Sequence, residues 1–190
     1  MNLLLHIAIP AMWLAWLAYW AFAARTVKET QRSEDVRSRL TYHLPLIVGG
    51  VLIAVPNILG PQLERLFVAR TPFWLALPIV LVAAGLSFSA AARVWLGRNW
   101  SSNVTVKREH ELIRSGPYAL VRHPIYTGLL LALIGTTLMV DNWRALIGLA
   151  IMLGAIVRKL KIEERFMTEQ FGEAYARYRA QVAMLVPFVV

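Results

Sequence analysis

The sequence predicts an all-α integral membrane protein with about five transmembrane helices, the last two forming a tight hairpin. Of its 190 residues, 58% are hydrophobic and only 16% are charged, whereas soluble domains are about 45–50% apolar and about a quarter charged. Long apolar segments recur along the chain, and the basic residues concentrate in alternate connections between them. We expect a single domain over residues 1–190, with three spans in residues 1–92 and the functional half in residues 93–190.

Five apolar segments account for the expected spans. Leu3–Ala23 is long enough to cross a bilayer core of about 30 Å, and the lack of a basic region before it favours a helix over a cleaved signal peptide. Leu44–Gly60 is shorter and contains two prolines, so we expect a kinked or marginal span. Pro72–Ala92 is a third, full-length candidate. Ile125–Val140 and Trp143–Val157 are short and separated by a two-residue polar turn, which predicts the hairpin.

The distribution of basic residues predicts the topology. Seventeen of the 20 lysines and arginines lie in the segments that follow spans one, three and five, and three lie in the other connections. The positive-inside rule then places the N-terminus outside and the C-terminus in the cytoplasm, as in a bacterial or archaeal inner membrane. The net charge of +9 thus reflects orientation and attraction to lipid headgroups, and we expect membrane lipid around the protein but no nucleic acid and no obligate protein partner.

The residue types present exclude some kinds of chemistry. Cysteine is absent, which excludes disulfides, thiol catalysis and cysteine-ligated metals. The four histidines are scattered along the chain, so we expect no metal site. Two long cytoplasmic segments, Arg93–Pro124 and Arg158–Val190, hold the polar volume of the molecule. Any chemistry should lie where these segments meet the spans.

The first cytoplasmic segment contains the stretch GPYALVRHPIYTG at residues 116–128. Its opening Gly-Pro pair is a turn signal, and Pro124 suits the first turn of a helix. His123 would then lie at the mouth of that helix, with Tyr126 on a similar face. The free N–H groups at a helix start suit a carboxylate or phosphate. Alternatively, His123 only caps the helix, and Arg122 and Tyr126 are interfacial anchors.

The second cytoplasmic segment predicts two short helices. Apolar residues at helical spacing give an amphipathic helix that ends at Gly172, and Tyr175 and Tyr178 continue the apolar period on the next helix. Glu163 and Glu164 fall one turn after the last span, near the membrane surface. Acidic side chains there need partners, which ordinary pairing with nearby basic residues would also provide.

These motifs together resemble the isoprenylcysteine carboxyl methyltransferase family. The resemblance rests on RHPIY at 122–126, an apolar helix pair, the Glu163-Glu164 pair, FGEAY at 171–175 and a closing LVPF at 185–188. It covers roughly residues 95–190, because the first three spans match only as hydrophobic helices. The short chain suggests a small prokaryotic member, for which a prenylated protein need not be the natural acceptor.

The resemblance implies a cytoplasmic pocket for S-adenosyl-L-methionine, built by the segment before helix four and the C-terminal helices. The implied cofactor contacts are His110, Leu112, Ile113, Tyr118, His123, Pro124, Ile125, Tyr126 and Glu163. A further polar contact is expected at Asn103 or Thr105. Lys159 or the adjacent Arg158 would face the carboxylate of the acceptor. The implied activity is carboxyl O-methylation of a lipophilic small molecule or prenylated substrate.

The chemistry of methyl transfer agrees with this residue set. A carboxylate acceptor is already ionised at neutral pH, so no general base is needed, and the protein acts mainly by positioning two reactants. A helix mouth at His123 could hold the carboxylate of the cofactor, and Glu163 could hold its ammonium group. Tyr118, Tyr126 and Trp100 could flank its adenine or its sulfonium.

Three other classes remain open at this point. A phospholipid or amine N-methyltransferase would need a base, for which His110 and His123 are the candidates. A sterol-type membrane reductase would bind NADPH and need basic residues for its 2′-phosphate, but the paired glutamates favour methyl transfer. A membrane scaffold without catalysis would leave the polar motifs unexplained.

Overall fold

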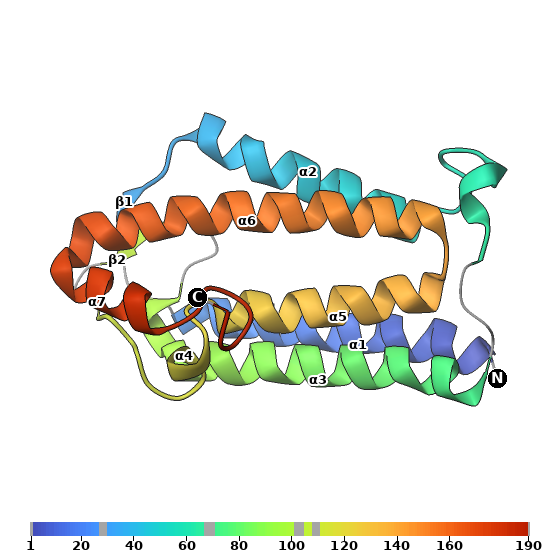
Figure 1. The fold of residues 1–190 in the computed structure, drawn as a ribbon, viewed down its shortest axis with the longest axis horizontal. Helices are drawn as coiled ribbons and strands as arrows, with labels where there is room; N and C mark the ends of the chain where they lie inside the picture. Colours follow the sequence, from blue (N-terminus) through green and yellow to red (C-terminus); the bar gives the residue numbers. More distant parts are fainter. Residues whose placement is uncertain (1, 27–29, 67–70, 101–104, 108–110, 190) are drawn as a thin grey trace.

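The computed structural model describes residues 2–26, 30–66, 71–100, 105–107 and 111–189. Five long helices run side by side along one axis (Figure 1). They are α1 (Asn2–Ala23), α2 (Val36–Ala54), α3 (Pro72–Leu96), α5 (Pro124–Val140) and α6 (Trp143–Phe171). Shorter elements connect them or follow them: η1 (Ala24–Thr26), β1 (Thr30–Ser33), η2 (Pro61–Glu64), η3 (Gly97–Asn99), β2 (Thr105–Lys107), α4 (Pro117–Leu120) and α7 (Glu173–Gln181).

The predicted all-α class is confirmed, with one small addition. The strands β1 and β2 pair antiparallel and form a two-stranded ribbon. The turn between α5 and α6 is also confirmed. Asp141 adopts the left-handed conformation (φ 54°), and the Asn142 side chain caps α6 by accepting a hydrogen bond from the N–H of Ala145.

Glycines set the distance between paired helices. Gly85 of α3 and Gly128 of α5 face each other so closely that a Cβ on either would overlap the backbone of the other helix. Gly49 of α2 and Gly148 of α6 do the same, because a Cβ on either would lie 2.7 Å from the carbonyl oxygen of the other. Small residues allow this close backbone approach. The bundle therefore contains two tight pairs, α3 with α5 and α2 with α6 (Figure 1).

Two helix boundaries differ from the sequence prediction. The second apolar helix was expected over residues 44–60, but α2 begins at Val36 and ends at Ala54. Asp35 caps its start by accepting from the N–H of Arg37, and Val55 leaves the helix because it precedes Pro56. The second cytoplasmic segment was expected to open with a helix of its own. Instead α6 continues without a break from the apolar hairpin to Phe171 and ends at Gly172 (φ 50°).

The outer faces of the bundle are apolar. Large hydrophobic side chains such as Leu14, Leu44 and Val80 are 59% exposed or more. Pro72–Leu96 is one helix among the described residues that is long and apolar enough to cross a membrane, with a mean hydropathy of 2.1. Two shorter apolar helices are Ile7–Ala23 and Pro124–Val140.

The helix directions bring the basic segments together. The end of α1, the end of α3 and the end of α6 all lie at one end of the bundle, together with α4 and α7 (left in Figure 1). The turn between α5 and α6 and the connection from α2 to α3 lie at the other end. The two polar segments of the sequence therefore meet in space at the end where the basic residues concentrate.

Candidate active site

A cavity opens at this basic end, where the residues around α4 meet the N-terminus of α5 and the C-terminal parts of α6 and α7. It encloses about 880 Å³, part of it continuous with solvent. Eight of the predicted site residues line it, namely Trp100, Leu112, Ile113, Tyr118, His123, Ile125, Tyr126 and Glu163. The sequence motifs therefore converge on one place although they are distant along the chain.

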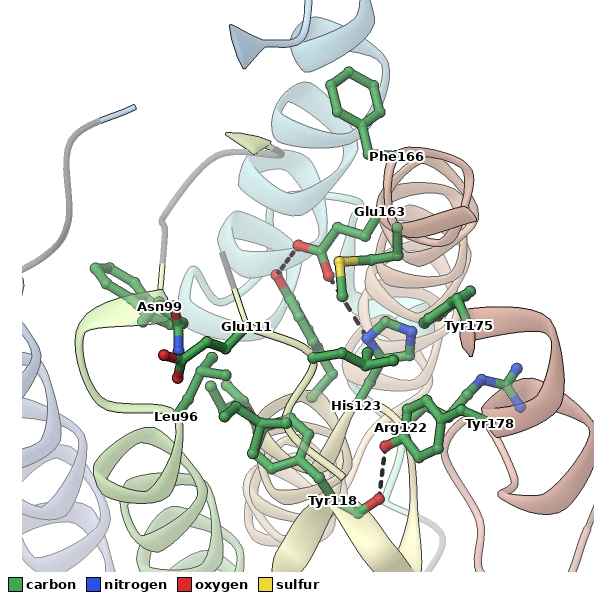
Figure 2. A pocket seen from close by; sticks show the side chains of 16 residues that line it. Leu96, Asn99, Glu111, Tyr118, Arg122, His123, Glu163, Phe166, Tyr175 and Tyr178 are labelled. Atoms are coloured by element: carbon green, nitrogen blue, oxygen red, sulfur yellow. Dashed lines mark hydrogen bonds and ion pairs between the residues drawn. The ribbon is translucent and has the colours of Figure 1, made fainter. Parts of the chain in front are cut away.

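The turn before α5 gives the cavity its shape. Gly116 has φ 60°, and a Cβ there would overlap the ring of Trp95, so this position requires glycine. Tyr118 follows in α4 and is buried. Its carbonyl oxygen accepts a 2.6 Å hydrogen bond from the hydroxyl of Tyr178 in α7 (Figure 2). This bond ties α7 to the turn, so both become walls of one cavity.

The C-terminal tail completes the mouth of α5. The N–H of Arg122 donates to the carbonyl of Ala183 at 2.8 Å, and the N–H of His123 donates to that of Met184 at 3.1 Å. The hydroxyl of Thr127 donates to the carbonyl of Leu185 at 2.7 Å. The stretch around the closing LVPF thus packs along the RHPIY stretch, which explains why the two motifs occur together.

Arg122, at the wall of the cavity, forms a buried ion pair with Glu164. The guanidinium donates from Nε at 2.8 Å and from Nη2 at 2.7 Å to the same carboxylate oxygen, and both side chains are 6% exposed. Arg122 also donates to the carbonyls of Arg179 and Val182. Burial alone would raise the pKa of the Glu164 carboxyl, but hydrogen bonds from His123 and Arg122 together hold it below its ordinary value. Glu164 is therefore an ionised, saturated carboxylate.

Glu163 has a different environment, although it is the next residue. Its carboxylate lines the cavity and its side chain is 22% exposed. Its contacts are longer: Nδ1 of His123 at 3.6 Å (Figure 2), the hydroxyl of Tyr126 at 3.4 Å and Nζ of Lys159 at 4.0 Å. A carboxylate with long contacts at a cavity wall can accept hydrogen bonds from a cationic ligand.

The two candidate acceptor cations lie in different places. Lys159 is 7% exposed, and its ammonium group lies 5.4 Å from the ring centroids of Tyr42 and Tyr126. Tyr42 in turn donates its hydroxyl to the buried carboxylate of Glu34. Arg158 is exposed and its Nε lies 3.5 Å from the hydroxyl of Thr41. Lys159 therefore lies beside Glu163, which lines the cavity, but is not itself a lining residue, whereas the exposed Arg158 lies next to Thr41.

The tyrosines of the wall are neutral hydrogen-bonding groups. Burial raises the pKa of the Tyr178 hydroxyl to about 12 and raises the pKa values of Tyr118 and Tyr175 as well. These hydroxyls stay protonated at any physiological pH and cannot act as bases there.

Pro124 is buried at the first position of α5, where it fixes the start of the helix. It does not line the cavity, whereas Ile125 and Tyr126 do. His110 and Asn103 lie outside the described residues. Thr105 belongs to β2 and only its backbone is described.

Several cavity residues were missed by the sequence analysis. They are Leu96, Asn99, Glu111, Arg122, Phe166, Met167, Tyr175 and Tyr178. For Tyr175 and Tyr178, the helical spacing predicted burial but not the cavity that they face. Arg122 belongs to the RHPIY stretch, yet its pairing with Glu164 across 42 residues has no local signal.

Comparisons with known proteins decide the family. Residues 75–169, half of the chain, match the model of the isoprenylcysteine carboxyl methyltransferase family.

The chain belongs to the isoprenylcysteine carboxyl methyltransferase family.

Its relatives include protein-S-isoprenylcysteine O-methyltransferase B of Arabidopsis thaliana, 29% identical over 114 residues that cover 58% of this chain and 58% of that one. The Homo sapiens protein-S-isoprenylcysteine O-methyltransferase is 28% identical over 154 residues, 79% of this chain and 52% of its own. The chain thus matches only about half of the length of these methyltransferases.

The fold is also shared with a solved member of the family. The structure described as the eukaryotic intramembrane Ras methyltransferase superposes on 78% of this chain and 52% of its own with a TM-score of 0.57 and 24% identity. At this identity the likeness concerns the fold. None of the relatives named above is a reductase or an amine methyltransferase, so the comparisons do not support those two alternatives.

Proposed function

We propose that this protein transfers a methyl group from S-adenosyl-L-methionine to a carboxylate on a lipophilic acceptor, of which a prenylcysteine is the model. The observation that carries the proposal is the position of Glu163, a carboxylate with long contacts on the wall of a cavity beside the N-terminus of α5. Family membership and the names of the relatives support the same reaction.

The residues at the cavity fit the amino-acid end of this cofactor. Pro124 has no N–H, and the backbone N–H groups of Ile125 and Tyr126 precede the first intrahelical bond of α5, which starts from Thr127. These two N–H groups and the partial positive charge of the helix start suit a carboxylate. Glu163, on the neighbouring helix, suits an ammonium group. The site therefore offers both charges that an α-amino acid group requires.

The protein's own contribution to the reaction is positioning. When bound, S-adenosyl-L-methionine supplies a methyl group that its sulfonium has already activated. Lys159 lies next to Glu163 and would hold the acceptor carboxylate in line, whereas Arg158 lies on the exposed face. The acceptor is ionised at neutral pH, so the walls need no base, in agreement with the protonated tyrosines.

We also propose that α1, α2, α3, α5 and α6 all span the membrane, with the N-terminus outside and the cavity at the cytoplasmic face of an inner membrane. The exposed apolar side chains of the bundle, the basic segments gathered at the cavity end and the intramembrane description of the solved relative support this arrangement. A lipophilic acceptor would then reach the cavity from the bilayer. Both helix pairs contribute to the one cavity, which supports a single functional unit.

Binding calorimetry on the detergent-purified protein tests the proposal. We expect S-adenosylhomocysteine to bind with micromolar affinity and NADPH not to bind. Glu163→Ala should abolish this binding, because the ammonium group of the ligand loses its counter-charge. Glu169→Ala removes an exposed carboxylate from the same helix and serves as the matched control.

Either of two results would overturn the proposal. One is NADPH binding without S-adenosylhomocysteine binding. The other is full affinity for S-adenosylhomocysteine in the Glu163→Ala variant, which would place the amino-acid end of the cofactor elsewhere.

A further inference from the structure

The indole of Trp100 lines the cavity on the side of α3. The guanidinium of Arg93 lies 4.6 Å from the centroid of this ring, and Trp20 of α1 contacts it edge to face at 5.7 Å. Arg93 is 3% exposed and is fixed by donating to the carbonyls of Gly97 and Ala23, each at 2.7 Å. The ring of Trp100 is therefore held in place at the cavity wall, and the guanidinium of Arg93 packs against it.

The position of Arg93 determines what Trp100 can bind. The face of an aromatic ring attracts one cation, and the guanidinium already occupies this position at the indole. A second cation on the same ring would gain less from the ring and would be repelled by Arg93. A neutral, flat ring carries no such penalty, and stacking of a nucleobase on an aromatic side chain is favourable for every base.

The surroundings of Trp100 suit a heteroaromatic base. Leu96 and Ile113 pack in the same apolar cluster and line the cavity with it. Asn99, the preceding residue, also lines the cavity and is 8% exposed. Its buried Oδ1 has no hydrogen-bond partner among the described residues. A base that carries an amino group has the donor that this acceptor lacks.

This wall lies across the cavity from the charged groups. In Figure 2, Leu96 and Asn99 lie on one side, and His123 and Glu163 lie on the other. A ligand with a base at one end and an amino-acid group at the other would span the two.

We propose that Trp100, backed by Arg93, is the stacking platform for the adenine ring of the cofactor and a determinant of ligand specificity, and that it takes no part in binding the sulfonium. This inference rests on the proposed function. It gives Trp20 of α1 and Arg93 of α3 a role in supporting the binding site through their contacts with Trp100.

Two ligands with the same base separate stacking from cation binding. S-adenosylhomocysteine has a neutral thioether, and sinefungin carries an ammonium group at the corresponding position. We expect Trp100→Leu to weaken both ligands equally, by about tenfold or more, as the loss of one stacked base implies. Trp100→Phe keeps an aromatic face and should stay within about threefold of the wild type. Trp143→Leu removes a 49% exposed tryptophan from the opposite end of the bundle and is the control.

Each other outcome has a defined meaning. A loss for sinefungin alone would make Trp100 a cation contact and overturn the inference. Trp100→Leu could instead bind both ligands with unchanged affinity while Glu163→Ala fails to bind them. This result would remove Trp100 from the site and leave the proposed function intact. Failure of the wild-type protein to bind either ligand would overturn the proposed function and this inference with it.

Discussion

The two ends of the α5–α6 hairpin each carry a buried arginine paired with a glutamate, and the candidate site lies at one of these ends. At the turn, Arg144 donates from Nε to Glu64 at 2.5 Å and also donates to the carbonyl of Leu52. Asn142 donates to the other oxygen of Glu64 at 2.6 Å. The guanidinium of Arg144 and the amide of Asn142 thus converge on one carboxylate, which ties the connection before α3 to the hairpin.

The cavity end of the hairpin has two consecutive glutamates, Glu163 and Glu164, whereas the turn end has one, Glu64. Glu164 corresponds to Glu64, since it pairs with an arginine and is saturated. Glu163 has no counterpart in the turn cluster, and its contacts are 3.4 Å or longer. Two consecutive residues of one helix thus differ: Glu164 is held in a buried ion pair, and Glu163 lines the cavity with contacts of 3.4 Å or longer.

The largest expected effect comes from breaking the buried ion pair of Arg122 with Glu164. Arg122→Leu should lower the free energy of unfolding by about 3–5 kcal/mol, because a charge removed from a buried pair leaves its partner uncompensated. Denaturant unfolding in mild detergent, followed by circular dichroism, measures this loss. Arg144→Leu is the matched variant at the turn and should cost less, since the Glu64 side chain is 21% exposed and keeps some hydration. Equal losses would contradict the role of burial.

A smaller effect is expected from Lys159, the cation beside Glu163. Lys159→Met should lower kcat/KM for N-acetyl-S-farnesylcysteine by about 10–100-fold, as the loss of one charge-assisted hydrogen bond implies. The loss should fall mainly on KM for the acceptor, with the affinity for S-adenosylhomocysteine within about threefold of the wild type. Arg158→Met, its exposed neighbour, should be close to wild type. The reverse pattern would assign the acceptor carboxylate to Arg158.

The smallest expected effect comes from the turn. Asn142→Ala removes the cap of α6 and a hydrogen bond to Glu64, and should cost about 1 kcal/mol of stability. The affinity for S-adenosylhomocysteine should not change, because the cavity lies at the other end of the hairpin. A weakened affinity, measured by calorimetry on the folded variant, would show that the two ends are coupled.

Most of the helices could be predicted because they depend on local signals. Apolar length, Pro124 at a helix start and Gly172 at a helix end are visible in the sequence, and the structure confirms them. The predicted start of α2 was eight residues too late, because hydropathy marks the apolar part of a helix and does not mark the capped polar turn that precedes it. The continuous α6 was missed for a related reason, since a polar, amphipathic stretch can extend an apolar helix without a change of backbone conformation.

The sequence by itself determined the helical class, the asymmetry of basic charge and the short motifs that indicate the family, since each depends on residues close together in the chain. Only the tertiary structure decided that Glu164 is saturated while Glu163 faces the cavity, because that difference comes from Arg122, 42 residues away. It also decided that Lys159 lies beside Glu163 while Arg158 lies beside Thr41, and that the guanidinium of Arg93 packs against the ring of Trp100. Successive residues on a helix point in different directions, and the partner that each side chain meets depends on how distant helices pack.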